Sequence, residues 1–508
     1  MGSKIHTLPC SLIPEHFLSL TLIAVLTLCS AAFCQTPPPW GKALSFGGSG
    51  ADIGSRVRVD RKNNKYVAGG FSGTATFGTR TLHSAGADDG FVMKFRSDGT
   101  FGWIVQIAGP SHDQAFDIGF DGNENLLVSG TITGNVTFGT VHGSPKAVST
   151  GGNSMFLAKY DPSGTLMWVQ TGTGGGDNEG FGVAVNPASG VVYMTGRAQG
   201  TTTFSSANGS SHTVGGGGEW HPYLVKYDDV GNFQWGESGG ASGNSIAHMV
   251  AIDSDNNAYL VGWFEGTITF GGHNGRSLSV VGFSPGPGGN PFPDDAFVTA
   301  YDDRGNVQWI NHLGGYKAIA TDVAVSPNGN ISVTGFIGNI DTHDEQAETI
   351  ATSQPPGSSV NLGGGIFTSP FNGDIFVTTY DPSGVLESAS RIGGSANDGG
   401  GGIAFDSDGS MYIGAEFGGT FSVGSVTVTG REANNTLVLK FSSSSDLDWA
   451  QTAQGAGSQD LENGPTLTVN PRTDKVFVTG PFSGSAIIGA TRLTSVGSSD
   501  IFFSSIPE

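Results

Sequence analysis

The chain has 508 residues, with 83 glycines, 13% charged residues and a formal net charge of -21. This length exceeds that of a single ordinary compact domain and predicts several domains or one repeat array. With 37% hydrophobic and 10% aromatic residues, the composition argues against disorder and indicates many short strands with glycine turns. The acidic excess argues against nucleic acid as a partner, whereas cations, neutral glycans and protein surfaces fit it.

The first 34 residues are expected to form a secretory signal peptide. Lys4 precedes the apolar run "FLSLTLIAVLTLCSAAF", and small residues suit cleavage between Ala31 and Gln35. An uncleaved membrane anchor is the alternative, but the run is short for a bilayer span. We therefore expect a secreted, periplasmic or cell-surface protein, residues 35–508, without a transmembrane segment. It is expected to lack disulfides and thiolate metal sites, because all three cysteines lie in the leader: Cys10, Cys29 and Cys34.

An apolar stretch, a polar turn and a tryptophan recur along the rest of the chain. The pattern appears as "DDGFVMKFRSDGTFGW" at residues 88–103, then as "NSMFLAKYDPSGTLMW", "HPYLVKYDDVGNFQW" and "DDAFVTAYDDRGNVQW". The spacing of about 60 to 80 residues exceeds the ordinary propeller repeat and leaves room for insertions. The closing position is occupied by Trp40, Trp103, Trp168, Trp235, Trp309, Leu386 and Trp449.

Each repeat is predicted to contain four strands. A glycine-rich entry such as "GGSGAD" leads to an alternating run such as "DVAVS", a turn and a second run such as "ISVTGFI". A variable stretch, a third run such as "DIFVTTY", a turn and the tryptophan run follow. This alternation is typical of strands, and no segment after the leader has a helical period. Seven first-strand runs are counted, beginning near Val57, Asp117, Val183, Val250, Val323, Ile403 and Leu467.

The two ends of the mature chain predict how the repeats close. The opening "WGKALSFGG" matches a fourth strand, and the final "DIFFSSIPE" matches a third strand. The N-terminal segment is therefore expected to supply the missing strand of the last repeat. We predict an all-β, seven-bladed β-propeller with four antiparallel strands in each blade, monomeric and without exposed sheet edges.

The pattern "GG…D…VAVD…GN.YVTG…FG…DAFVAKYD..G…W" resembles the bacterial seven-bladed β-propeller repeat of exported proteins. The resemblance covers nearly all of the chain after the leader, most clearly in "KYDPSG" at residues 159–164 and "DIFVTTYDPSG" at 374–384. Two repeats depart from it, with "VLESAS" in place of the tryptophan run and "SSSSD" in place of the turn. The resemblance implies the fold and export, but no particular activity.

The two faces of such a propeller are expected to differ. The turns from third to fourth strand are short, and their aspartates are interpreted as turn formers, with calcium ligation as the alternative: Asp161, Asp228, Asp302 and Asp381. The links from second to third strand are long and variable, which favours a binding role for protein or glycan. Five residues in these links are predicted to contact a ligand, or alternatively to pin the loops to the blades: Trp220, His221, Phe283, Phe292 and Phe371.

The links that lead into the first strands carry an acidic or amide residue at comparable points. A ring of such oxygens at the axis predicts a calcium site, whereas capping of each loop's own amides is the alternative. The residues are Asp52, Asp113, Asp177, Asn244, Asp398 and Asp460.

No catalytic constellation stands out, and an enzyme is not favoured. The string "GPSHD" at residues 109–113 is set aside because adjacent residues rarely face one another as a triad. We favour a binding or scaffold module for protein or glycan. The alternatives are a structural envelope protein and a polysaccharide-active enzyme, whose loop acids would include Glu219, Asp294 and Asp295.

Overall fold

The computed structural model describes residues 35–215, 218–282, 294–314, 317–338, 358–363, 366–369, 373–431, 435–457 and 464–507. This part of the chain is all-β, as the alternation predicted, and it contains strands and turns but no helix. Accordingly, it offers no helical segment that could cross a membrane. The predicted signal peptide, residues 1–34, lies outside the described residues.

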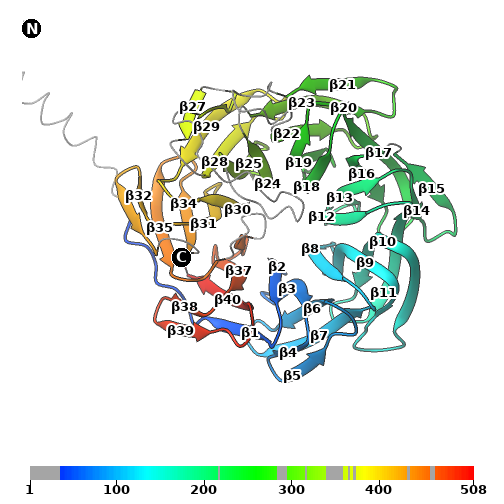
Figure 1. The fold of residues 1–508 in the computed structure, drawn as a ribbon, viewed down its shortest axis with the longest axis horizontal. Coiled ribbons are helices and arrows are strands. Elements are labelled where there is room, and N and C mark those ends of the chain that lie inside the picture. The colour runs from blue at the N-terminus through cyan, green and yellow to red at the C-terminus, as the bar shows by residue number, and fades with distance from the viewer. Residues whose placement is uncertain are drawn as a thin grey trace, which may run out of the picture.

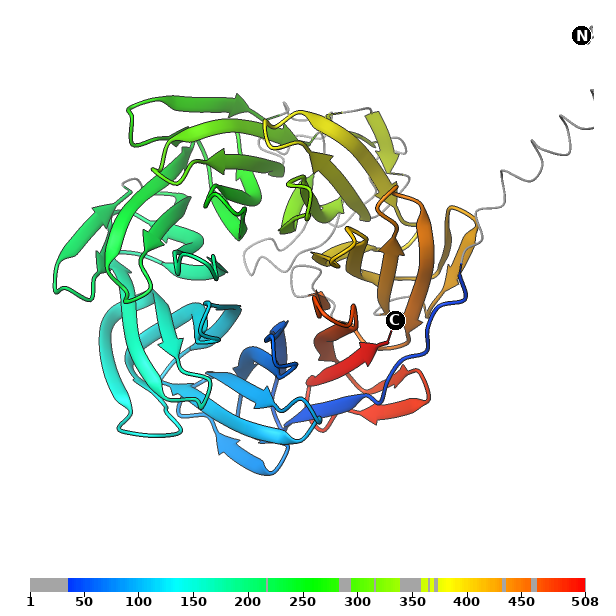
Figure 2. The same cartoon turned by 180° about the vertical axis from the view of Figure 1, so that it is seen from behind.

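The strands form antiparallel sheets arranged around a central axis as a β-propeller (Figures 1 and 2). Most of the strands fall into four-strand sets, whose strands are named here in order from the axis outward. The sets are β2 (Asp52–Val59), β3 (Lys65–Phe71), β6 (Asp89–Phe95) and β7 (Phe101–Ala108); β8 (Gln114–Phe120), β9 (Leu126–Phe138), β10 (Lys146–Tyr160) and β11 (Leu166–Gly174); β12 (Glu179–Val185), β13 (Val192–Gln199), β16 (Trp220–Tyr227) and β17 (Phe233–Ala241). They continue with β18 (Ser245–Ile252), β19 (Ala258–Glu265), β22 (Asp294–Tyr301) and β23 (Val307–Leu313); β24 (Ala318–Val325), β25 (Ile331–Ile337), β28 (Asp374–Tyr380) and β29 (Leu386–Ile392); β30 (Gly399–Phe405), β31 (Met411–Phe417), β34 (Asn435–Phe441) and β35 (Leu447–Ala453); and β36 (Thr466–Val469), β37 (Val476–Phe482), β40 (Asp500–Ile506) and β1 (Leu44–Gly48).

The last set joins the two ends of the chain. Strand β1 pairs antiparallel with β40, and Phe46 lies opposite Ile501. The amide of Gly41 donates to the Ser505 carbonyl at 2.6 Å, and the Trp40 indole donates to the Thr452 carbonyl at 2.8 Å. The strand pairing that the terminal sequences predicted is therefore present.

The links from second to third strand form hairpins, which the sequence analysis treated as variable loops. They are β4 (Thr74–Phe77) with β5 (Arg80–His83), the outer halves of β9 and β10, β14 (Thr202–Ser205) with β15 (Ser211–Val214), β20 (Thr267–Gly271) with β21 (Ser277–Val281), β26 (Ser358–Asn361) with β27 (Ile366–Ser369), β32 (Thr420–Val423) with β33 (Val426–Thr429), and β38 (Ser485–Ile488) with β39 (Thr491–Thr494). We call these the inserted hairpins. Several pair with the fourth strand of the preceding set: β4 with β1, β9 with β7, β14 with β11 and β20 with β17. Each such hairpin thereby joins two neighbouring sheets.

The repeated tryptophan and the repeated turn contact each other across neighbouring sets. Gly164 lies in the turn before β11, and its φ of 87° brings the backbone against the Trp103 ring of β7. A Cβ atom at this glycine would lie 3.0 Å from that ring. The Trp103 indole also donates to the Pro162 carbonyl at 3.3 Å. Gly231, Gly305 and Gly384 face the preceding tryptophan in the same way, so this contact explains why the two motifs recur together.

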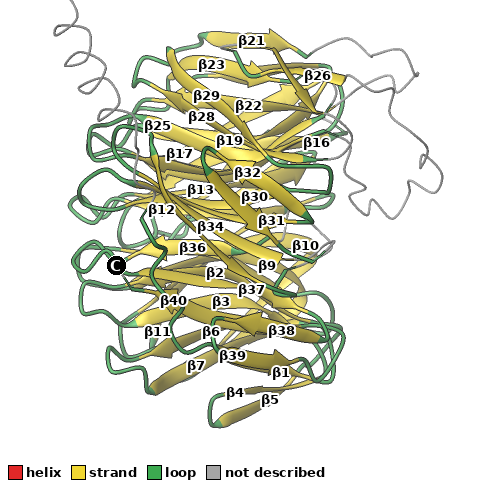
Figure 3. Ribbon diagram, turned by 90° about the vertical axis from the view of Figure 1, so that its left-hand side faces the viewer, coloured by secondary structure: helices red, strands yellow, loops and turns green. Residues whose placement is uncertain are grey.

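Loops gather on two opposite faces of the propeller (Figure 3). We call one the short-turn face, which carries hairpin turns such as residues 60–64 and 121–125. The other is the link face, which carries the entries to the first strands, such as residues 109–113 and 174–178. Because each first strand runs from the link face to the short-turn face, its first and last residues contribute to different sites.

Candidate binding sites at the central axis

A buried ion-pair cluster joins three first strands at the axis. The Arg56 guanidinium of β2 contacts Asp117 of β8 at 3.0 Å and Asp322 of β24 at 3.1 Å. Arg56 is 2% exposed, and its third nitrogen lies 3.0 Å from the Met249 sulfur of β18. The carboxylates hold the guanidinium in its charged form, and their attraction raises the pKa of Arg56 despite its burial.

Backbone amides complete the coordination of both carboxylates. Asp117 accepts the Ile118 amide on one oxygen and the Val183 amide on the other, at 2.9 and 3.0 Å. Asp322 likewise accepts the Val323 amide of its own strand on one oxygen and the Ile403 amide of β30 on the other. The cluster therefore fixes several sheets relative to one another. Sequence analysis missed it, although charged residues inside otherwise aliphatic first-strand runs were a visible signal.

A layer of rings lies next to this cluster on the link-face side. The first strands β2, β8, β12, β18, β24 and β30 have a β-bulge at the same place. The bulge residues of three successive sets are Phe116, Phe181 and His248. Phe116 and Phe181 pack edge to face at 5.2 Å, and Phe181 and His248 do so at 6.1 Å. Burial lowers the pKa of His248 to about 4, so this ring is neutral at physiological pH. The rings and the ion pairs lie between the cavities on the two faces.

A cavity of about 260 Å³ opens on the link face. Its lining is polar apart from Phe116 and consists of Asp88, His112, Gln114, Thr131, Asn153 and Glu179. Asp88 is paired with the exposed His112 ring. Burial raises the pKa of Asp88, while the neighbouring His112 opposes that shift. The Thr131 hydroxyl is buried and has no hydrogen-bond partner among the described residues. The cavity thus offers acceptors, amides and a free hydroxyl beside one aromatic ring.

One wall of this link-face cavity leads to a predicted ligand residue. Glu179 pairs with Arg197 at 2.9 Å, and the Arg197 guanidinium lies 4.0 Å from the centre of the Trp220 ring. Trp220 is half-buried at the start of β16. A cation over an aromatic ring is mutually stabilising, so Trp220 supports the arginine that orients Glu179.

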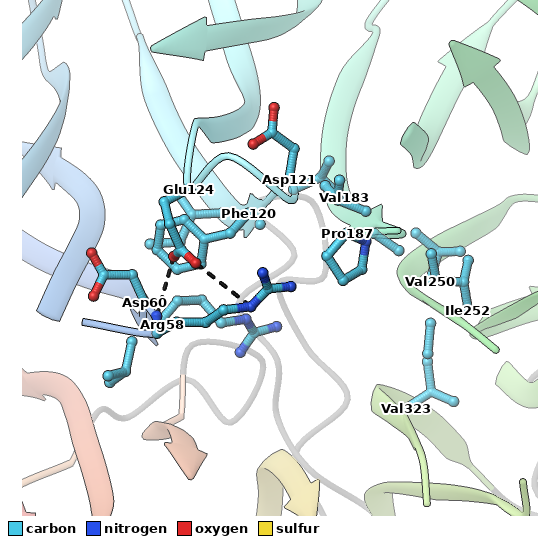
Figure 4. Close-up of a pocket in the computed structure, with 17 residues that line it drawn as sticks. Arg58, Asp60, Phe120, Asp121, Glu124, Val183, Pro187, Val250, Ile252 and Val323 are labelled. Carbon is cyan, nitrogen blue, oxygen red and sulfur yellow. Dashed lines mark hydrogen bonds and ion pairs between the residues drawn. The ribbon is translucent and has the colours of Figure 1, made fainter. Parts of the chain in front are cut away.

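A second cavity, of about 330 Å³, lies on the short-turn face. Figure 4 shows valines from several first strands along one side, among them Val183, Val250 and Val323, and Arg58, Asp60 and Glu124 on the other. Strand β8 contributes Phe120 here, whereas its first residues line the link-face cavity. The two cavities are therefore separate sites at opposite ends of the first strands.

Two of the five predicted ligand residues, Trp220 and His221, lie in the part of the chain that the structure describes. Phe283, Phe292 and Phe371 lie outside the described residues. His221 is 5% exposed, and burial lowers its pKa. It occupies the buried second position of β16, beside Trp220. Of the two that the structure describes, Trp220 is connected to the link-face cavity through Arg197 and Glu179.

The proposed calcium ring appears as separate loop caps where the chain is described. Asp52 accepts the Gly48 amide at 2.7 Å, and Asp113 accepts the Thr133 amide at 2.9 Å. Asp398 accepts the Gly394 and Gly418 amides at 2.8 and 3.0 Å. In the described part of the chain no three His, Cys, Asp or Glu side chains form a group that could hold a metal. The capping alternative matches these contacts, and Asp460 lies outside the described residues.

Two members of that ring lie one residue away from the equivalent position. Asp52, Asp113 and Asp398 each precede the bulge residue of their first strand by three. In the sets that begin with β12 and β18, this position is occupied by Asn178 and Ser245, both fully buried. The predicted Asp177 and Asn244 come just before them. Asp177 instead accepts from the Asn153 amide group at 3.1 Å, and Asn244 accepts from the Trp220 amide at 3.3 Å.

The buried cap at Asp398 predicts a measurable pH dependence. Burial, with Asp374 nearby, raises the pKa of Asp398 to about 7. Since an unfolded aspartate titrates near 4, the stability from this group is present below about pH 4 and is lost as the pH rises through about 7. The variant Asp398→Asn should therefore gain about 2–3 kcal/mol of unfolding free energy relative to the unsubstituted chain between about pH 5 and pH 8. Denaturant unfolding followed by tryptophan fluorescence measures this.

The matched control is Asp381→Asn. Asp381 is an exposed turn aspartate whose pKa is lowered by hydrogen bonds from Ser383 and the Val385 amide. The change in unfolding free energy caused by Asp381→Asn should be the same at about pH 5 and at about pH 8. Equal pH dependence in both variants would refute the assignment of the raised pKa to Asp398.

The other acidic residues considered from sequence are engaged in the fold. Asp294 pairs with Lys317 at 3.3 Å, and Asp295 is fully buried. The backbone carbonyl of Glu219 lies 3.2 Å from a ring nitrogen of His221. The turn aspartates accept amides two and four residues ahead, as Asp161 does from Ser163 and Thr165 at 2.8 and 2.9 Å. These contacts are those expected of turn formers.

No family model matches the chain. It is 22% identical over 521 aligned residues to the uncharacterized WD repeat-containing protein L264 of Acanthamoeba polyphaga mimivirus, covering 88% of this chain and 36% of that protein. It is 24% identical over 339 residues to the regulatory protein FlaEY of Caulobacter vibrioides, covering 61% of this chain and 34% of that protein. The chain therefore spans about a third of the length of these curated relatives.

Solved structures with a similar chain path include two lyases. A streptogramin B lyase has a TM-score of 0.38 and 9% identity, with 92% of this chain and 97% of the other covered. The virginiamycin B lyase from Staphylococcus aureus has a TM-score of 0.39 and 8% identity, with 91% and 98% covered.

Proposed function

We propose that the chain is an exported, seven-bladed β-propeller that acts as a binding module for a neutral glycan on its link face. The antiparallel pairing of β1 with β40 supports closure by the two chain ends. The name of the viral relative, a WD repeat-containing protein, is consistent with a repeat propeller used for binding or as a scaffold. The observation that carries the proposed function is the polar cavity of about 260 Å³ on the link face.

The lining of this cavity fits the chemistry of a sugar residue. Sugar hydroxyls both donate and accept hydrogen bonds, and the carboxylates and amides of Asp88, Gln114, Asn153 and Glu179 provide partners of both kinds. Phe116 provides the aromatic surface that a sugar ring can pack against. The lining contains no lysine or arginine, and the chain carries a net charge of -21, so a neutral glycan fits better than an acidic one.

Binding of a panel of neutral oligosaccharides to the chain tests this function. Thr131→Val removes a buried hydroxyl that lacks a partner within the described residues while keeping the side-chain shape. Affinity should fall by about five- to tenfold, since a neutral hydrogen bond contributes about 1 kcal/mol. Gln114→Ala should reduce it further. Thr76→Val, an exposed threonine on β4, is the control and should bind normally.

The same experiment separates binding from catalysis. Asp88 and Glu179 line one cavity, and the raised pKa of Asp88 favours its protonated form, as suits a general acid. A polysaccharide-active enzyme is therefore the second candidate. Retention of intact oligosaccharide supports the binding module, whereas shortened products that disappear in Asp88→Asn would establish the enzyme. Absence of binding and of products across the panel, with a protein ligand retained instead, would refute the glycan proposal.

A further inference from the structure

The cavity on the short-turn face carries a second inference, which does not depend on the proposed glycan site. We propose that it binds a small molecule with a single carboxylate attached to an apolar group, and that Arg58 receives the carboxylate. The side chain of Arg58 is 29% exposed and lines this cavity of about 330 Å³. The volume lies within the range of small-molecule pockets.

Arg58 has few partners for its charge. Its contact with Asp117 is long, at 3.6 Å, and its contact with the Val57 carbonyl is 3.5 Å. The Asp117 oxygen in question already accepts Arg56 at 3.0 Å and the Ile118 amide at 2.9 Å. Asp117 is therefore committed elsewhere, and the Arg58 guanidinium keeps donors that a ligand carboxylate can accept in a two-point interaction.

The other charged groups at the cavity are satisfied within the protein. Asp60 accepts the amides of Lys62 and Asn64 at 2.9 and 2.8 Å. Asp121 pairs with Lys159 at 2.8 Å. Glu124 accepts the Arg61 amide at 3.1 Å and pairs with its side chain at 3.6 Å. Arg58 and Arg61 both line the cavity, and each lies 3.6 Å from a carboxylate. They differ because the Asp117 oxygen near Arg58 is already used by Arg56 and the Ile118 amide.

The walls define the rest of the ligand. Val183, Val250, Ile252 and Val323 supply aliphatic surface around the cavity (Figure 4). An apolar group that fills this space gains from leaving water. The carboxylates of Asp60, Asp121 and Glu124 at the cavity would repel a second negative charge. A monocarboxylate with an aliphatic or aryl body therefore fits better than a phosphate or a dicarboxylate.

The test compares matched ligands that differ only in charge. Straight-chain carboxylates from butanoate to decanoate, together with benzoate, are titrated against the chain by ligand-observed NMR and calorimetry. The corresponding primary amides serve as neutral counterparts. We expect at least one carboxylate to bind and its amide to bind about tenfold or more weakly, because the charge-assisted contact with Arg58 is lost.

Three variants assign the site. Arg58→Gln should weaken the carboxylate about tenfold or more and make acid and amide bind alike. Ile252→Phe enlarges a wall residue of the cavity while keeping Arg58, and should also weaken binding. Arg80→Gln makes the same chemical change on the exposed part of β5 and should bind as the unsubstituted chain does.

Three outcomes would overturn the inference. They are failure of every carboxylate in the series to bind, equal binding of acid and amide, or undiminished binding in a folded Arg58→Gln variant. If Arg58→Gln does not fold, the comparison of acid with amide and the Ile252→Phe variant still decide. Since the Thr131→Val variant lies at the other cavity, it should leave carboxylate binding unchanged, so failure of either proposal can be recognised separately.

Discussion

Arg56→Met is expected to lower the free energy of unfolding by about 3–5 kcal/mol, because it leaves two buried carboxylates without their cation. Asp117 and Asp322 are 1% and 4% exposed, and both contact Arg56 within 3.1 Å. Methionine keeps much of the length and apolar surface of the arginine stem, so the loss reports the charge rather than a void. Urea unfolding followed by tryptophan fluorescence measures it.

The control for this prediction is Arg58→Met on the same strand. Arg58 is more exposed and contacts Asp117 only at 3.6 Å, so its replacement should cost less than about 1 kcal/mol. Arg56→Lys should fall between the two, since lysine keeps the charge but cannot bridge two carboxylates with a planar fork. If Arg56→Met and Arg58→Met had equal effects, the ion-pair cluster would not be a structural centre.

Removal of residues 35–48 is expected to abolish cooperative unfolding of the remaining chain. This segment supplies β1. It buries Trp40 and Ala43 against the last two four-strand sets, and Phe46 between the last set and the first. Loss of two buried aromatic side chains alone costs about 3–5 kcal/mol each, and the edges of β40 and β4 lose their partner strand. Calorimetry and circular dichroism of the shortened chain would show a broad transition, and sedimentation would show self-association through the open edges.

A peptide of residues 35–48 provides the control. Added in excess, it should restore a sharp unfolding transition, because the pairing with β40 is between separate segments and needs no covalent link. The same peptide with Trp40→Ser and Phe46→Ser should fail to do so. A shortened chain that unfolds as sharply as the full chain, without the peptide, would contradict closure by β1.

The strands were predicted well where apolar and polar residues alternate along the sequence. Runs such as those at Val57 and Val323 lie in first strands because they alternate and are bounded by turn residues. The inserted hairpins were missed, since four-residue strands around a glycine, such as "TATFGTRTL", are too short for alternation to distinguish from loop.

The candidate sites were harder to predict because they depend on contacts between distant repeats. Arg56 and Asp322 are 266 positions apart and meet only because their strands converge at the axis. The register of the capping position is fixed by a β-bulge, which local sequence does not reveal, so Asp177 was chosen in place of Asn178. Of the aromatic residues, Trp220 lies near the link-face cavity through Arg197, a partner that no spacing rule indicated.

The inserted hairpins also constrain how the protein can diverge. A hairpin that pairs with the preceding sheet, as β20 does with β17, has to keep its register and its short strands. Segments beside the hairpin do not have to keep this register, so their length is less constrained. Duplication of a whole repeat supplies both the hairpin and the strand that receives the next one. Repeats can therefore multiply as complete units, while new sequence accumulates in the segments that flank the hairpins.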